Sequence, residues 1–159
     1  MSDRAPPDDG NLIGELANVR DTCLLRAARR TANLLTRVYN QHLAPLGLEA
    51  TQFTILCAVA SGRAGSSTEL AAMLGIERST LTRNLERLVS AGLVVPAQGE
   101  GRRLTHKLSR TGAARLRQAL PRWRAAQEAV LAGMPGGDGA PAREQLGLLR
   151  RSARGLAAG

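Results

Sequence analysis

Side chains that can hydrogen-bond to nucleic acid crowd the start of one amphipathic segment. They are Arg78, Ser79, Thr80, Thr82, Arg83 and Arg87. An arginine can hold a guanine edge with two parallel hydrogen bonds, and serine or threonine can contact bases. A helix that enters the major groove presents its N-terminal side chains to the bases. The pattern therefore predicts a helix, from Arg78 to about Ser90, that reads duplex DNA.

A second group of cations follows in Gly99-Glu100-Gly101-Arg102-Arg103. We interpret Leu93–Val95 and Leu104–Leu108 as strands of a hairpin whose turn begins at Pro96. An arginine at such a tip can reach the minor groove or the flanking phosphates, and Glu100 can hold Arg102 as an ion pair. An arginine-rich loop is usually a solvated turn. Its position directly after the predicted reading helix favours a DNA contact by Arg102 and Arg103.

A helix-turn-helix would place the reading helix. Ser66 precedes Glu69 by three residues, which is a capping-box pattern and predicts a helix start. Gly75 suits the left-handed end of that helix, and the reading helix begins after only Ile76 and Glu77. Ser66, at the edge of this motif, is also a predicted DNA contact. An ordinary helical hairpin would use the same glycine but does not explain the polar face of the second helix.

Further helices flank this motif. Apolar residues at intervals of three or four predict one long helix from about Leu12 to Ala44. A helix of that length is too long for a small globule to cover, so we expect it to pack against a partner chain. The other expected helices are one capped by Thr51 that buries Phe53, Leu56, Val59 and Ala60, one from about Gly112 to Leu131 that contains Pro121, and one from Ala142 to about Leu156, after a flexible connector over 133–141.

The fold class expected from these elements is mainly α with a small β-hairpin wing. We predict a disordered tail over residues 1–10 and an N-terminal dimerisation helix over 11–47. A winged helix-turn-helix DNA-binding domain follows over 48–111, and C-terminal dimerisation helices over 112–157. A chain of 159 residues is long enough for one sizeable core.

Composition limits the function classes. The net charge is +9, and residues 61–117 alone carry ten basic and four acidic side chains. An excess of cations at one place indicates an acidic partner. With one Phe, one Tyr and one Trp the chain cannot stack several bases, so duplex DNA is favoured over single strands. Two isolated cysteines and two histidines predict no zinc site, and we expect no cofactor. No signal core or membrane span is apparent, so we expect a soluble, cytoplasmic protein.

These motifs resemble the MarR family of bacterial regulators from about Cys23 to Val130. The resemblance rests on Leu43-Ala44-Pro45-Leu46-Gly47-Leu48 with Gln52-Phe53, Glu69-Leu70-Ala71 with Leu74-Gly75-Ile76, Glu77-Arg78-Ser79-Thr80-Leu81-Thr82-Arg83, Leu88 with Gly92-Leu93-Val94, and Leu108-Ser109 with Gly112. Glu100-Gly101-Arg102 stands where the family wing has Asp-x-Arg. His106 replaces an aliphatic strand residue of the family, which suggests a shorter or less regular wing.

The resemblance implies a homodimer that binds a pseudo-palindromic operator, represses neighbouring genes and releases DNA when a small anionic or aromatic effector binds. Polar residues of the first long helix are the candidates for that effector: Arg26, Arg30, Tyr39 and His42. In a redox-sensing branch of the family a cysteine near the start of this helix is the sensor, which makes Cys23 a candidate. A lone cysteine on an apolar stripe is more often a small core residue.

Three rival interpretations remain open. One is a redox-sensing regulator of the same fold, and another is a non-specific architectural DNA-binding protein. The third is a winged-helix module that binds protein, against which the polar reading face argues. We do not expect an enzyme, because the sequence lacks a phosphate loop, paired carboxylates in an apolar setting and a nucleophilic triad.

Overall fold

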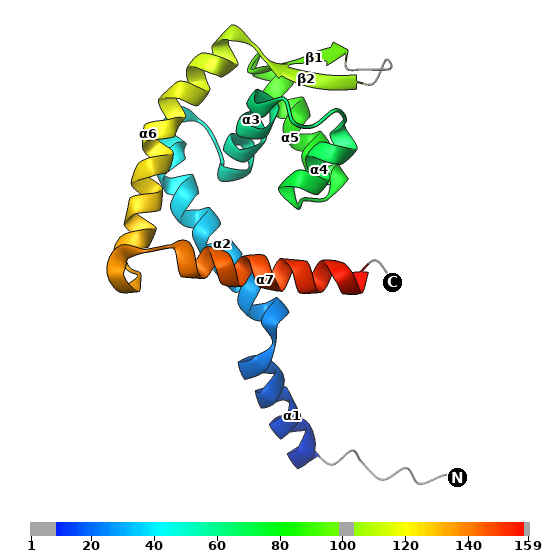
Figure 1. Cartoon of the computed structure of the whole chain (residues 1–159), viewed down its shortest axis with the longest axis vertical. Helices are drawn as coiled ribbons and strands as arrows, with labels where there is room; N and C mark the ends of the chain where they lie inside the picture. The colour runs from blue at the N-terminus through cyan, green and yellow to red at the C-terminus, as the bar shows by residue number, and fades with distance from the viewer. Residues whose placement is uncertain (1–8, 99–103, 158–159) are drawn as a thin grey trace, which may run out of the picture. The chain divides into compact units, whose positions relative to one another are not determined.

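The computed structural model describes residues 9–98 and 104–157. The chain divides into two compact units, Met1–Arg37 and Val38–Gly159. The first unit contains α1 (Asp9–Thr22) and the N-terminal part of α2 (Leu24–Leu43), drawn in blue in Figure 1. The second unit begins within α2 and holds all the remaining elements.

The sequence predicted one continuous helix over 12–44, but the structure has two helices there, separated at Cys23. The prediction of a single helix was therefore wrong. The side chain of Thr22 donates a hydrogen bond to the carbonyl of Asn18 at 2.8 Å. Threonines inside the unbroken helices make the same bond, at Thr36 and Thr82, so this bond alone does not break a helix. The Asn, Val, Asp, Thr and Cys residues around Cys23 are weak helix formers, which favours a break there. The apolar spacing continues across the break, and for that reason the pattern did not reveal it.

The second unit has mainly helices and one hairpin. Its elements after α2 are η1 (Ala44–Leu46), α3 (Ala50–Ser61), α4 (Ser67–Leu74), α5 (Arg78–Ser90), β1 (Val94–Gln98), β2 (Leu104–Leu108), α6 (Arg110–Ala132), η3 (Pro135–Gly137) and α7 (Ala140–Ala157). This order agrees with the expected fold class, mainly α with a small hairpin. The connector expected over 133–141 contains η3 and the first residues of α7.

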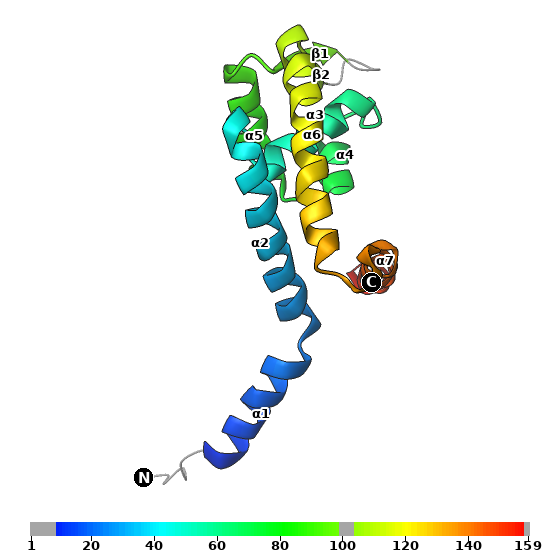
Figure 2. The same cartoon turned by 90° about the vertical axis from the view of Figure 1, so that its left-hand side faces the viewer.

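The core of the second unit lies around α3. This helix contacts α4, α5, α6 and β2, which enclose it in Figures 1 and 2. The largest fully buried side chains are Leu43, Ile55, Leu56, Leu81, Leu88 and Val94. Burying a leucine side chain contributes about 1.5–3 kcal/mol, so this cluster fixes the helices that carry the reading face.

The start of α3 differs from the expected one. Glu49, not Thr51, is the N-cap residue, and the Gln52 side chain accepts a hydrogen bond from its backbone N–H at 3.1 Å. The N–H of Ala50 donates to the side chain of Asn40 at 2.7 Å. These two bonds begin the helix before Thr51. Phe53, Leu56 and Val59 are buried as predicted, whereas Ala60 is exposed.

The hairpin is longer than expected, because β1 continues to Gln98 instead of ending at Val95. The strands pair antiparallel from Val94 with Leu108 to Gln98 with Leu104, and Pro96 lies opposite His106. Proline is tolerated there because each strand of a two-stranded sheet has a free edge. The described part of the wing is therefore regular, contrary to what the histidine suggested.

No single helix in the described ranges is long and apolar enough to cross a membrane. Two consecutive segments, Leu24–Leu46 and Ala50–Ser61, reach that length and apolar composition only when they are taken together, and the chain bends by 77° between them.

Candidate nucleic-acid interface

The turn between α4 and α5 has the geometry that the sequence predicted. The Ser66 side chain caps α4 by accepting a hydrogen bond from the N–H of Glu69 at 3.2 Å. Gly75 ends α4 with a φ of +64°, and the next N–H, of Ile76, reaches back to the carbonyl of Ala71 at 3.1 Å. Only glycine adopts such a φ without strain, so the turn can be this short. The helix that follows, α5, begins at Arg78.

One side of α5 is buried and the other carries the predicted contact residues. Leu81, Leu85 and Leu88 pack into the core, whereas Thr80 is half-buried. The remaining predicted residues of this helix are exposed, namely Arg78, Ser79, Thr82, Arg83 and Arg87. The helix thus brings the predicted polar face together on one element and turns it to solvent.

Within the described part of the chain, the ion pair that the structure contains joins Arg20 and Asp21 of α1. The cations of α5 therefore have no acidic partner among the described residues. Three exposed guanidinium groups on one short helix, without an ion-pair partner among the described residues, favour an anion. The first N–H groups of α5 lack intrahelical acceptors, as at any helix start, and add a positive end to the same place. This surface can therefore hold phosphate groups and present Arg83 to base edges.

The base of the hairpin is closed against α5 and α6. The N–H of Ser109 donates to the carbonyl of Leu93 at 3.0 Å, and its hydroxyl donates to the carbonyl of Gly92 at 2.6 Å. The same hydroxyl accepts from the N–H of Gly112 at 2.9 Å, which starts α6. A Cβ on Gly112 would overlap the carbonyl oxygen of Leu93, so only glycine fits at this contact.

His106 connects the hairpin to the helix-turn-helix. Its ring lines a narrow cavity between β2, the end of α3 at Val59, and the first residues of α4, Ser66 and Ser67. Burial lowers the pKa of this imidazole below its usual value of 6.5. A neutral ring can therefore take the place of an aliphatic residue in this contact. The tip with Glu100, Arg102 and Arg103 lies outside the described residues.

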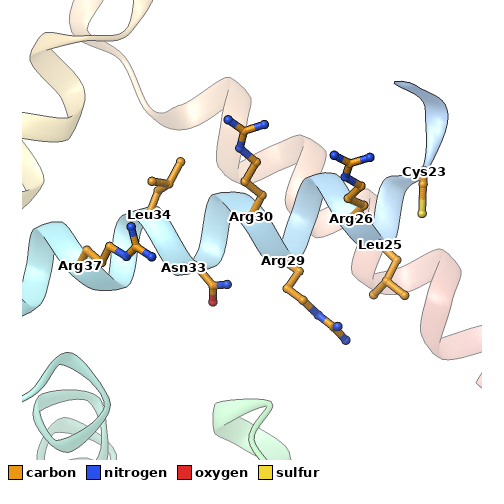
Figure 3. Close-up of a pocket in the computed structure, with 8 residues that line it drawn as sticks. All are labelled: Cys23, Leu25, Arg26, Arg29, Arg30, Asn33, Leu34 and Arg37. Carbon is orange, nitrogen blue, oxygen red and sulfur yellow. The ribbon is translucent and has the colours of Figure 1, made fainter. Parts of the chain in front are cut away.

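The effector candidates do not all meet in one place. Arg26 and Arg30 line one cavity of about 560 Å³ together with Cys23 and Leu34. In Figure 3 these two arginines point to the same side of α2, and Arg29 points to the other. Arg29 and Arg37 also line this cavity, and because helix α2 contains no Asp or Glu, none of these arginines has a counter-charge on its own helix.

Tyr39 and His42 have contacts inside the second unit. The hydroxyl of Tyr39 donates to the Gln127 side chain on α6, and burial raises the pKa of this phenol. The His42 ring bonds the carbonyl of Val38 at 2.9 Å. Neither residue lines the cavity that contains Arg26 and Arg30. Cys23 does line it, and both cysteines, Cys23 and Cys57, are free thiols.

Sequence reasoning missed two residues that shape this region. Asn84 is 8% exposed in the buried face of α5, where its Nδ2 donates to the carbonyl of Thr80 at 2.8 Å and its Oδ1 has no partner in the described part of the chain. Arg115 of α6 donates to the carbonyl of Leu46. An asparagine at a core-facing helix position was a visible signal. The arginine contact spans 69 residues of sequence, and no local pattern indicates it.

Comparison with known proteins gives consistent matches. The MarR family model matches residues 46–103. The multiple antibiotic resistance protein MarR of Escherichia coli is 36% identical over 80 residues, which cover 49% of this chain and 56% of that protein. An uncharacterized HTH-type transcriptional regulator of Bacillus subtilis is 30% identical over 50% of this chain and 58% of its own length. The chain thus spans little more than half the length of these curated relatives.

Solved structures match over more of the chain. The M. tuberculosis transcriptional regulator MosR, solved in complex with DNA, is 37% identical with a TM-score of 0.74 and covers 84% of this chain and 98% of its own. A mutant MarR from E. coli complexed with operator DNA is 25% identical, with a TM-score of 0.72 over 83% and 96%. A Mycobacterium tuberculosis MarR family protein in complex with p-aminosalicylic acid is 27% identical, with a TM-score of 0.58 over 84% and 98%. From the helix-turn-helix geometry and these matches, we conclude that the chain belongs to the MarR family.

Proposed function

We propose that this protein is a homodimeric, sequence-specific DNA-binding repressor, released from its operator by a small molecule. The observation that carries the proposal is the exposed face of α5, where Arg78, Arg83 and Arg87 form no ion pair with any described residue. A buried face of leucines fixes the helix, so these side chains are presented at defined positions rather than on a loop. Such a helix fits the major groove, with Arg83 at the base edges.

Affinity and sequence reading have different sources in this proposal. Contacts to phosphates supply most of the binding free energy and make it depend on salt. Contacts to bases supply the preference for one sequence. We assign Arg78 and Arg87, with the wing arginines Arg102 and Arg103, mainly to phosphates, and Arg83 with Ser79 and Thr82 to base edges. Ser66 lies at the start of α4, where its backbone can contact a phosphate.

Dimerisation is supported by apolar side chains that a monomer leaves in water. On α1, Leu12, Leu16 and Val19 are each at least half exposed and share one face at helical spacing. On α7, Leu146 and Leu148 are also exposed. Contiguous exposed apolar faces mark interaction sites. We propose that residues 11–47 and 112–157 form the contact with a second copy, so that two α5 helices face a palindromic site.

An effector is supported by the cavity beside Arg26 and Arg30. A MarR family neighbour was solved with p-aminosalicylic acid, which is an aromatic carboxylic acid. Two guanidinium groups that point to one side of α2 provide charge for such an anion. We propose that an anionic effector binds there and weakens operator binding, and that the protein works in the cytoplasm, where bacterial DNA lies.

The test measures binding of the purified protein to the duplex upstream of its own gene and to a random duplex of equal length, across a salt series. We expect one dimer to bind the first duplex about 10³-fold or more tightly at physiological salt. Arg83→Ala should reduce this discrimination by about 1–3 kcal/mol. Arg87→Ala removes the same charge from an exposed position of the same helix that we assign to phosphates; as the matched control it should weaken binding to both duplexes about equally.

Two outcomes would contradict the proposal. Equal affinity for both duplexes, lost together as salt rises, would indicate the architectural alternative. Equal losses for Arg83→Ala and Arg87→Ala, independent of sequence, would show that Arg83 contributes charge and does not read bases.

A further inference from the structure

His106 fills a contact between the hairpin and the helix-turn-helix. It lies in the middle of β2, which packs against α3 and α6. Its half-buried ring lines a cavity of about 20 Å³, with room for about one water molecule, between the end of α3 and the first residues of α4. We propose that this contact is a pH-sensitive switch, in which the hairpin separates from the start of α4 when the ring becomes positively charged and operator affinity falls.

The residues that line this cavity carry no charge other than the one that His106 itself can acquire. The polar side chains among them are the hydroxyls of Ser66, Ser67 and Thr105. The hydroxyl of Ser66 already accepts a hydrogen bond from the N–H of Glu69 at 3.2 Å. A neutral imidazole fits such surroundings, whereas an imidazolium would lose its hydration without gaining a counter-charge.

The charged side chains on the neighbouring elements also disfavour an imidazolium. Helix α3 and strand β1 contain no charged residue. Among the described residues of the other neighbours, Arg63 precedes α4, Lys107 lies on β2 and Arg110 begins α6, and all three are cations. The acidic residue is Glu69 of α4, whose carboxylate accepts from the N–H of Gly65 at 2.8 Å and does not line the cavity. Burial lowers the pKa of the imidazole below its usual 6.5, which agrees with these surroundings.

The hairpin is held at its base, which gives it a point about which to turn. Ser109 donates there to the carbonyls of Leu93 and Gly92, at 3.0 and 2.6 Å. His106 lies further along β2, and beyond it the two strands stay paired to the end of β1. When the ring leaves its cavity, the hairpin therefore turns about its base as one piece, and its outer end moves relative to α4.

Operator affinity depends on this contact because α5 and the hairpin must meet one DNA molecule together. The buried leucines of α5 fix that helix in the core, whereas the contact at His106 sets where the hairpin lies relative to α4. A hairpin that has turned away no longer adds its phosphate contacts while α5 is in the major groove, and affinity is lost. This regulatory part of the inference rests on the proposed function, but the separation of the hairpin does not.

The pH range of the switch follows from its two states. In the closed state, burial holds the pKa of His106 below 6.5, and in the open state the hydrated ring returns to a pKa of about 6.5. Above pH 6.5 the ring is neutral in both states, so pH does not change the balance between them. Between the two pKa values the open state binds the proton more readily, and each pH unit of acidification favours it by up to about tenfold.

NMR titration of the full-length protein from about pH 8 to about pH 5 tests the separation. The chain has two histidines, so His106→Leu identifies the ring signal of His106 by removing it. In the wild type we expect nuclear Overhauser contacts between this ring and the methyl groups of Val59, which lines the same cavity, to disappear as the ring titrates. Contacts between Val94 and Leu108 at the paired base of the hairpin should persist throughout and exclude general unfolding.

Operator affinity is measured over the same pH range at constant ionic strength, with the duplex upstream of the protein's own gene. Wild-type affinity should fall about threefold or more between about pH 7.5 and pH 5.5, because the charged ring favours the open state. Neither His106→Leu nor His106→Gln carries a titratable group at this position, so their affinities should change less than about twofold. His106→Gln keeps the comparison valid where the leucine variant lacks the wild-type circular dichroism.

Several outcomes decide the inference. Contacts between His106 and Val59 that persist after the ring has titrated, or a ring that titrates at or above pH 6.5, would overturn the switch. Loss of these contacts without a change in operator affinity would retain the separation and refute its regulatory part. An equal pH dependence of operator affinity in the wild type and in both variants would refute the regulatory part as well. Absence of operator binding at every pH would refute the proposed function and leave the NMR result to decide the separation.

Discussion

Gly112→Ala tests the contact that closes the base of the hairpin. A Cβ at this position would overlap the carbonyl oxygen of Leu93 and would lie 2.8 Å from its carbonyl carbon and 3.2 Å from its Cα. All three atoms are backbone, so no side chain can rotate away. The substitution must therefore move the start of α6 away from the strand, or remain strained.

The magnitude follows from two opposing effects. Alanine in place of glycine favours a helix by up to about 1 kcal/mol. Overpacking costs about 1–3 kcal/mol. A shift also weakens two hydrogen bonds, from Ser109 N–H to Leu93 O at 3.0 Å and from Gly112 N–H to the Ser109 hydroxyl at 2.9 Å. Each of these bonds contributes about 1 kcal/mol. We expect a net loss of about 1–3 kcal/mol, which corresponds to a fall in Tm of about 3–10 °C.

Thermal and urea unfolding followed by circular dichroism measure this loss. The matched control is Gly14→Ala, at an exposed position of α1 where a Cβ meets nothing within 4 Å. The control should leave Tm unchanged or raise it. A Gly112→Ala protein that is as stable as wild type, or more stable, would refute the reasoning, because helix propensity would then outweigh the contact with Leu93.

Three further predictions concern single side chains. Burial lowers the pKa of His106 in the folded protein, so the unfolded chain binds the proton more tightly. The free energy of unfolding should therefore fall as pH drops through 6.5 toward the lower folded pKa. Urea midpoints measured across that range should show this fall in the wild type and not in His106→Leu. Replacing Asn84 by Leu removes a buried Oδ1 that has no partner among the described residues. The free energy of unfolding, measured by urea titration, should stay the same or rise by up to about 1 kcal/mol. A fall of more than about 1 kcal/mol would mean that the oxygen is satisfied in the native protein. Ser66→Ala removes the cap of α4 and should cost about 1 kcal/mol, with Ser67→Ala as the control one position later; equal effects of the two would show that the cap is unimportant.

The helix-turn-helix could be predicted because its signals are local. Ser66 and Glu69 are three residues apart, Gly75 marks a turn by itself, and the leucines of α5 repeat within the helix. Periodicity then predicts that Arg83 and Arg87 are exposed, since they lie across the helix from the buried leucines, whereas Arg78, seven residues before Leu85, is exposed because it begins the helix. Each of these inferences depends on residues within a few turns of one another.

The features that escaped prediction depend on distant parts of the chain or on competition between similar signals. The stacked rings of Phe53 and Trp123 belong to α3 and α6, and only packing brings them together. The start of α3 is set by Glu49 with the distant side chain of Asn40, although Thr51 is the better cap by type alone. The apolar spacing continues across the interruption at Cys23, so the pattern that predicts the helices does not reveal the break between them.

The closed base of the hairpin has a consequence for how this protein can change over evolution. Bonds from Ser109 to Leu93 and Gly92 fix both ends of the segment between them, independently of what lies between Gln98 and Leu104. Residues added there lengthen a segment whose ends are already held, and doubling the length of a closed segment costs only about 0.6 kcal/mol of closure entropy. The segment between Gln98 and Leu104 can therefore gain or lose residues over evolution while α5 stays in place.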